Sequence, residues 1–200
     1  IKPRDDEAII EKAKLAEEAG APAVASDIDA ATLINMRIFG QPVGPKSAAS
    51  IKKIADSVVI PFIVKGVMSK EEALACVEAG AKGIVVSNHG GRQLDGALSS
   101  IRMLPEVVSA VGDQIEIHLD SGIRSGQDVL KALAMGAHGT MIGRSYIYGL
   151  GAMGEAGVTK ALEVIRKELD ITMALCGERD VKELGRQNLL IPKDFLDSYV

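Results

Sequence analysis

The chain contains few aromatic residues and no excess of positive charge. Tryptophan is absent, tyrosine and phenylalanine occur three times each, and the formal net charge is −4. Proteins that bind single-stranded nucleic acid commonly stack the bases on aromatic side chains. Binding to phosphate backbones also needs a concentrated excess of Lys and Arg. We therefore expect no nucleic-acid partner.

Cysteine is nearly absent, and long hydrophobic runs are absent. Cys76 and Cys176 are far apart in sequence and lack the spacing of a zinc or redox motif, so we expect two buried thiols in a reducing compartment and no metal. No apolar run has the length that spans a bilayer. The first ten residues, "IKPRDDEAII", are typical of the start of a soluble helix and not of a signal peptide. These features predict a soluble, cytoplasmic protein without a membrane partner.

Short apolar runs alternate with longer amphipathic stretches along most of the chain. The expected strands are residues 21–26, 59–65, 83–87, 115–120 and 139–143. The expected helices are residues 5–19, 46–56, 70–79, 99–111, 125–135 and 155–175. Strands separated by helices cannot pair as hairpins, so the pattern predicts an α/β fold with a parallel sheet.

Both a doubly wound sheet and a (β/α)₈ TIM barrel fit this alternation, and the phosphate-binding pattern described below favours the barrel. With 200 residues, of which 47% are hydrophobic, the chain is suited to one domain over residues 1–200. A complete barrel of eight units needs about 250 residues, and only five units are visible. We expect an incomplete barrel, the C-terminal portion of a longer one that lacks the first three strands.

Polar residues gather where the expected strands end. In parallel α/β folds this edge carries the active site. It collects Asp27, Asp29, Lys65, Ser87, His89, Arg92, Asp120, Arg124, Gly143 and Arg144. The segments "DSGIRSG" and "IGRS" follow the last two strands, where backbone N–H groups and a helix N-terminus favour a phosphate group. The alternative is that these glycines and arginines are ordinary loop residues.

His89 stands in "SNHGGRQLD", directly after a buried strand. It is either a structural histidine or a base, and Arg92 close to it is suited to bind a carboxylate through two hydrogen bonds. Lys65 ends an apolar strand and is either an exposed strand terminus or a charge stabiliser in the pocket. His118, in the barrel interior or on the helix-facing side, and His138, in the turn before a strand, receive no catalytic role.

Four segments together resemble the family of FMN-dependent 2-hydroxy-acid oxidases and dehydrogenases, which includes glycolate oxidase, lactate oxidase and flavin-linked lactate dehydrogenases. They are "PFIVKGVMSKEEA", "GIVVSNHGGRQLD", "LDSGIRSGQDVLKALAMGA" and "IGRSYIYGLGAMGEAGV". The resemblance implies a TIM barrel that binds FMN and oxidises an L-2-hydroxy acid, such as lactate or glycolate, to the 2-keto acid.

The resemblance also implies roles for individual residues. His89 is then the base, Asp27 stabilises its protonated form, Arg92 binds the substrate carboxylate, and Lys65 lies beside the flavin ring. The residues expected to contact FMN are Lys65, Ser87, Asp120, Ser121, Gly122, Arg124, Gly143 and Arg144. Members of the family are often tetramers, so a homo-oligomer is expected.

The segment 26–47 is shorter than the long loop that often follows the fourth strand of the family's barrel. Its single arginine, Arg37, has no clear counterpart there. Two other functions stay open: a barrel isomerase or lyase that acts on a phosphorylated substrate, and a non-catalytic partial barrel that associates with itself or with a partner, including the missing N-terminal part.

Overall fold

Five parallel strands form the centre of the computed structural model, which describes residues 1–41 and 43–195. The strands are β1 (Val24–Asp27), β2 (Phe62–Val67), β3 (Gly83–Val86), β4 (Glu116–Leu119) and β5 (Gly139–Thr140). Their order in the sheet is the order in the chain, β1-β2-β3-β4-β5. A doubly wound sheet reverses its strand order at a switch point, whereas a barrel does not. The expected α/β fold with the strand arrangement of a TIM barrel is confirmed.

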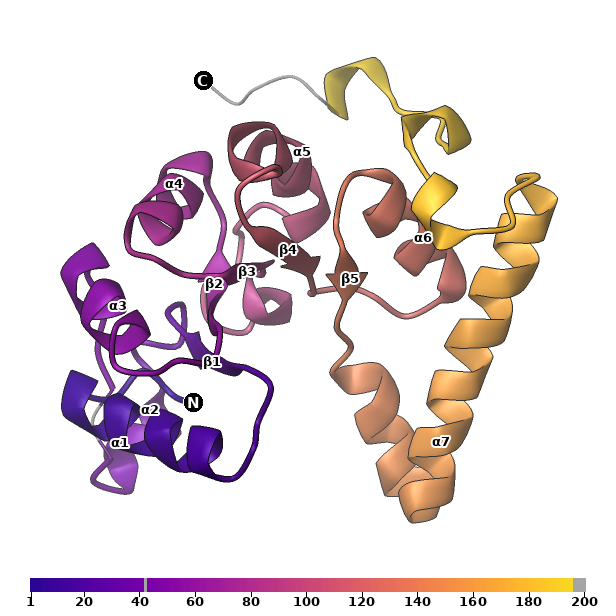
Figure 1. Ribbon diagram of the computed structural model, residues 1–200. Helices are drawn as coiled ribbons and strands as arrows, with labels where there is room; N and C mark the ends of the chain where they lie inside the picture. The colour runs from indigo at the N-terminus through magenta and orange to yellow at the C-terminus, as the bar shows by residue number, and fades with distance from the viewer. Residues whose placement is uncertain (42, 196–200) are drawn as a thin grey trace.

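Helices surround this curved row of strands, and the long last helix extends away from it beside the helix that precedes it (Figure 1). They are α1 (Asp6–Glu18), α2 (Ile34–Ile38), α3 (Ala48–Ala55), α4 (Lys70–Glu78), α5 (Ser100–Val111), α6 (Gly126–Ala134) and α7 (Arg144–Leu175). Short 3₁₀ turns occupy His89–Gly91, Val181–Glu183, Arg186–Asn188 and Lys193–Phe195. The sequence did not predict α2 or these turns, because segments of three to five residues are too short for a hydrophobic pattern to repeat.

Four helices begin where a side chain can accept a hydrogen bond from an N–H group of the first turn. Asp5, Ser47, Ser69 and Ser125 do so for α1, α3, α4 and α6. Such caps satisfy donors that have no partner inside the helix. They explain why these helices start within two residues of the expected positions.

Helix α7 is longer than the expected segment 155–175. It begins at Arg144 and is interrupted at Met153 and Gly154, where the backbone leaves helical geometry and Gly154 has φ 61°. On either side of the interruption, Gly149 and Gly157 pack backbone against backbone, with no room for a Cβ atom on either residue. α7 is therefore a helical hairpin. The sequence did not predict its first arm, which is rich in glycine and begins at Arg144, shortly after β5.

The two faces of the sheet have different chemistry. Val64, Ile84, Val86, Ile117 and Leu119 are buried and pack with the helices in one hydrophobic core. Residues that alternate with them point to the opposite face. There, partners in register are Asp27 with Lys65, Lys65 with Val85, and Val85 with His118. The strands therefore hold ionisable side chains together on the face away from the helices.

The two histidines without an assigned role make local contacts. On the inner face of β4, the Nε2 atom of His118 lies 3.2 Å from Oε1 of Glu116. The Nδ1 atom of His138 accepts a hydrogen bond of 3.0 Å from the backbone N–H of Ile117 and so ties the turn before β5 to β4.

The two cysteines differ in exposure. Cys76 lies on the buried side of α4, as expected. Cys176 is exposed, so the prediction that it is buried is wrong. Cys176 is the residue that directly follows the last turn of α7, where its side chain is open to solvent. None of the helices in residues 1–41 and 43–195 has the length and apolar character to cross a membrane.

The thiol chemistry of the folded chain follows from this difference. Burial, together with the charge of Glu72, raises the pKa of the Cys76 thiol to about 12, so it stays protonated and covered at pH 8. We expect a disulfide reagent to modify one thiol, Cys176, in the native protein and two after unfolding in guanidinium. Rapid reaction of both thiols in the native state would contradict the packing of α4, and a Cys176→Ser variant identifies the reactive site.

Candidate active site

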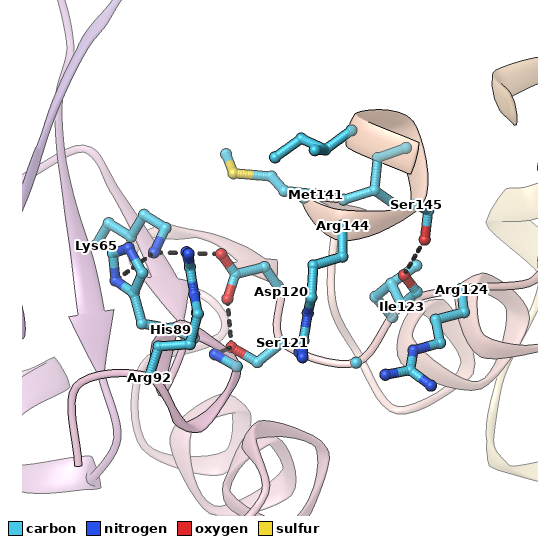
Figure 2. A pocket seen from close by; sticks show the side chains of 15 residues that line it. Lys65, His89, Arg92, Asp120, Ser121, Ile123, Arg124, Met141, Arg144 and Ser145 are labelled. Carbon is cyan, nitrogen blue, oxygen red and sulfur yellow. Dashed lines mark hydrogen bonds and ion pairs between the residues drawn. The ribbon is translucent and has the colours of Figure 1, made fainter. Parts of the chain in front are cut away.

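One pocket opens at the carboxyl ends of β2, β3, β4 and β5, where the sequence pattern placed the site. Figure 2 shows Lys65, His89 and Arg92 at one end, Arg124 at the other, and Arg144 between them. The lining residues are Lys65, His89, Gly90, Arg92, Asp120, Ser121, Gly122, Ile123, Arg124, Met141, Ile142, Gly143, Arg144, Ser145 and Ile147. Asp27 and Ser87 lie outside this lining, and so does Arg37, which is exposed on α2.

The part of the pocket that runs from Arg144, whose guanidinium lies against Gly90, to Arg124 has the properties of an anion site. No ion pair of residues 1–41 and 43–195 involves either guanidinium group. Gly143 precedes α7 without a side chain that caps its first N–H groups, and a Cβ atom on Gly122 or Gly143 would meet nothing within 4 Å. Two free guanidinium groups, a helix N-terminus and open backbone are the donors that a phosphate group requires.

At the other end, the ammonium group of Lys65 is held by several partners at once. It donates to Oγ of Ser87 at 3.0 Å and lies 3.2 Å from Oδ2 of Asp120 and 3.7 Å from Oδ1 of Asp27. Only 17% of the Lys65 side chain is exposed. The Lys65 ammonium is therefore a fixed positive charge facing the pocket, and not an exposed strand terminus.

His89 lies beside this charge in an unusual backbone conformation, with φ 57°. Its Nδ1 atom is 3.1 Å and 3.2 Å from the two carboxylate oxygens of Asp29. The Lys65 ammonium, which can only donate, lies 3.4 Å from the same Nδ1 atom. The two carboxylate oxygens are closer and only accept hydrogen bonds, so we place the hydrogen on Nδ1, which leaves a free lone pair on Nε2. The Asp29 carboxylate also stabilises the charged imidazolium after it takes up a proton.

The carboxylate in direct contact with His89 is therefore Asp29, whereas the stabilising role expected of Asp27 stays a prediction. The carboxylate of Asp27 instead accepts a hydrogen bond of 2.6 Å from the Lys2 ammonium. Burial opposes ionisation of Asp27, but the hydrogen bond from Lys2 and the charges of Lys2, Lys65 and His89 outweigh it and lower the pKa of this carboxyl. A metal ion would find three close ligands here, namely Asp27, Asp29 and His89. However, the ammonium groups of Lys2 and Lys65 already neutralise negative charge beside Asp27.

Gly66 gives Asp29 room to reach the histidine. It lies at an irregularity in β2 with φ 104°, and a Cβ atom here would come within 2.6 Å of the Asp29 carboxylate. β1 ends at Asp27, and the chain then crosses over Gly66, which carries Asp29 farther along the pocket edge. The sequence placed both aspartates at the end of the same expected strand, and nothing in it separated the two.

Ser87 and Arg92 complete this end of the site. Ser87 is fully buried, and its Oγ atom accepts hydrogen bonds from Lys65 and from the backbone N–H of His89. Arg92 is exposed, and its Nε atom donates to the carbonyl oxygen of His89 at 3.2 Å. This bond leaves the terminal nitrogens of Arg92 available next to the imidazole.

Comparisons with known proteins identify the family. The family model of FMN-dependent dehydrogenases matches residues 25–191. The chain belongs to this family. An L-lactate dehydrogenase of Caulobacter vibrioides is 52% identical over 137 residues, which are 68% of this chain and 36% of that protein. A pre-mycofactocin synthase of Mycobacterium tuberculosis is 48% identical over 136 residues, 68% of this chain and 34% of that protein.

Solved structures of mandelate oxidase have the same fold. One of them superposes with a TM-score of 0.84 at 36% identity and covers 92% of this chain and 60% of the mandelate oxidase chain. The chain thus spans about a third of the length of the curated relatives that it matches. FMN is the cofactor of the family, and the arginines and open backbone at the Arg124 end of the pocket fit its phosphate.

The ion pair of Lys2 with Asp27 has a pH-dependent effect on stability. Because the pKa of Asp27 is lowered by folding, its contribution is present above the unfolded value of about 3.9 and is lost as the pH falls through the folded value. We expect Lys2→Met to lower the free energy of unfolding by about 1 kcal/mol at pH 7, and by less below pH 4. Urea denaturation at both pH values measures this.

An equal loss at both pH values would show that Lys2 acts through packing and not through charge. Lys53→Met is the matched control, since the Lys53 pair with Glu7 is exposed, and we expect it to change the stability little.

Proposed function

We propose that the protein containing this chain uses FMN to oxidise a small L-2-hydroxy acid to the corresponding 2-keto acid. The observation that carries this proposal is the arrangement of one pocket: a histidine oriented by a carboxylate, with an arginine beside it and an anion site opposite. The first part is suited to take a proton from a substrate that carries a carboxylate, and the second to hold a phosphorylated cofactor.

The residues present suggest how FMN is held. Gly122, Arg124, Gly143 and Arg144 would bind its phosphate, and Asp120 its ribityl chain, while the Lys65 ammonium would lie near the ring. Bound FMN supplies the acceptor for the two electrons and for the second hydrogen that leave the substrate, while the first hydrogen goes to His89 as a proton. A fixed cation beside the ring stabilises the negative charge that these electrons bring, and Lys65 is held for this role by Ser87 and Asp120.

His89 would act as the base through Nε2. Its Nδ1 side is bound to Asp29, so the free lone pair on Nε2 accepts a proton from the substrate as the alcohol becomes a carbonyl. The imidazolium that results stays paired with the Asp29 carboxylate. Only 12% of the His89 side chain is exposed, which strengthens this interaction compared with water.

Arg92 would bind the substrate carboxylate. Its Nε atom is used by the carbonyl of His89, which ties the position of the guanidinium to that of the base. The two terminal nitrogens can then bind a carboxylate in a fork. The relatives named above include lactate and mandelate enzymes, so we infer a 2-hydroxy acid and test both small and aromatic members.

The first test is reduction of bound FMN in the absence of oxygen. We expect L-lactate, glycolate or mandelate to bleach the flavin absorbance of the wild-type protein, and His89→Asn to bind FMN but reduce it at least 100-fold more slowly. His118→Asn is the matched control with a rate near wild type, since His118 lies outside the pocket. Bound flavin that no 2-hydroxy acid reduces would refute the proposal, and activity without flavin would favour an isomerase or lyase.

The second test separates the two aspartates. Asp29→Asn removes the carboxylate that contacts His89, and we expect flavin reduction to slow about 10- to 100-fold. Asp27→Asn leaves that contact intact and should slow the reaction less. Stopped-flow absorbance measures both rates, and a larger loss for Asp27→Asn would mean that Asp29 is not the partner of the base.

A further inference from the structure

Two residues other than glycine have positive φ angles in the described part of the chain, and both lie at the pocket. They are His89, with φ 57°, and Ser121, with φ 74°. L-amino acids other than glycine rarely adopt this conformation, and it persists only where surrounding contacts hold it. His89 follows β3 and Ser121 follows β4, so the two strained loops are neighbours at the edge of the sheet.

The Ser121 hydroxyl connects these loops. Its Oγ atom accepts hydrogen bonds from the backbone N–H groups of Asn88 at 3.2 Å and Gly90 at 3.0 Å, the residues on either side of His89. It donates its own hydrogen to Oδ1 of Asp120 at 2.7 Å (Figure 2). The Oγ atom of Ser87 lies 3.4 Å away as a further, longer contact. A hydroxyl has one hydrogen and two lone pairs, so the three shorter bonds satisfy it.

This contact differs from the others that shape the His89 loop. Asn88 also accepts hydrogen bonds from Gly90 and Gly91, and Ser87 accepts one from His89. Both acceptors belong to the same chain segment after β3 and do not tie it to the loop after β4. Ser121 is anchored on the next strand, and through Asp120 it is linked to the Lys65 ammonium, 3.2 Å from Oδ2. One hydroxyl thus couples the base to the charge that faces the cofactor.

We propose that Ser121 is a positioning residue for His89: its side chain holds the histidine loop, instead of contacting FMN as the family resemblance implies. The consequence for the rate rests on the proposed role of His89 as the base, whereas the contact itself does not. The choice of residue agrees with this. Glycine would adopt φ 74° more easily than serine but has no hydroxyl to accept hydrogen bonds. Alanine has neither the backbone freedom of glycine nor the hydroxyl of serine. Threonine keeps the hydroxyl but adds a β-branch at a strained position.

Ser121→Gly is the decisive variant because it relieves the backbone strain at φ 74° and removes the side chain that carries the hydroxyl. If Ser121 were merely a turn residue, glycine would be tolerated or stabilising. We expect instead that amide hydrogen exchange at Asn88 and Gly90 becomes about tenfold faster, measured by mass spectrometry on a peptide from this loop. We also expect the ¹⁵N signals of the His89 ring to move, while those of His118 and His138 stay in place.

The same variant separates positioning from cofactor binding. We expect the Kd for FMN to change less than twofold and flavin reduction by the 2-hydroxy acid to slow about tenfold. A large loss of FMN affinity at an unchanged reduction rate would overturn the proposal in favour of a direct cofactor contact. Faster exchange without any change in rate would also overturn it, because the loop would then not need this bond to present His89.

Two further variants serve as controls. Ser121→Ala keeps the strained backbone and removes the hydroxyl, so it should increase exchange at Asn88 and Gly90 as Ser121→Gly does; protection retained in the alanine variant would assign the effect to the backbone and refute the proposal. Ser145→Ala removes another hydroxyl from the pocket wall, which donates to the Ile123 carbonyl, and should leave exchange in the His89 loop unchanged.

If the wild-type protein reduces no flavin, the proposed function fails. Amide exchange and the ¹⁵N signals of the His89 ring then still decide whether Ser121 holds the loop.

Discussion

The positive charge of Lys65 at the end of β2 is the constraint that organises the rest of the site. A half-buried ammonium needs partners with negative charge or lone pairs, because burial without them is costly. Ser87, Asp120 and Asp27 provide them from three other strand ends or loops. The parallel sheet makes this possible, since it brings the carboxyl ends of neighbouring strands to one edge.

The loops beyond these strand ends carry strain that the site uses. His89 and Ser121 both have positive φ angles, and Gly66 has the backbone freedom and the missing Cβ atom that let Asp29 pass over β2. Each departure from regular geometry places a functional group: the imidazole, the hydroxyl that holds its loop, and the carboxylate that orients it. Buried hydrogen bonds through Ser87 and Ser121 offset the cost of this strain.

The pocket is also divided by charge in a way that suits two ligands with negative groups. Arg124 and Arg144 have no acidic partner in the described residues, whereas Lys65 lies among carboxylates. A guanidinium group without an acidic partner is suited to bind a phosphate. An ammonium group held in place by carboxylates is suited to stabilise negative charge that develops during a reaction. The family's cofactor, FMN, carries a phosphate at one end and a redox-active ring at the other, and the pocket has matching ends.

The sequence by itself determined the alternation of strands and helices, the parallel sheet, and the gathering of His89, Arg92, Lys65 and the two arginine loops at one edge. These features follow from local periodicity and from short motifs, which act over a few neighbouring residues. Only the tertiary structure decided that Asp29 and not Asp27 meets His89, that Lys2 neutralises Asp27, and that Ser121 points toward the histidine loop. The two aspartates are separated by one residue and follow the same expected strand, so the sequence cannot distinguish them. The choice depends on the path of the chain over Gly66 after β1 ends, and on contacts between residues far apart in sequence.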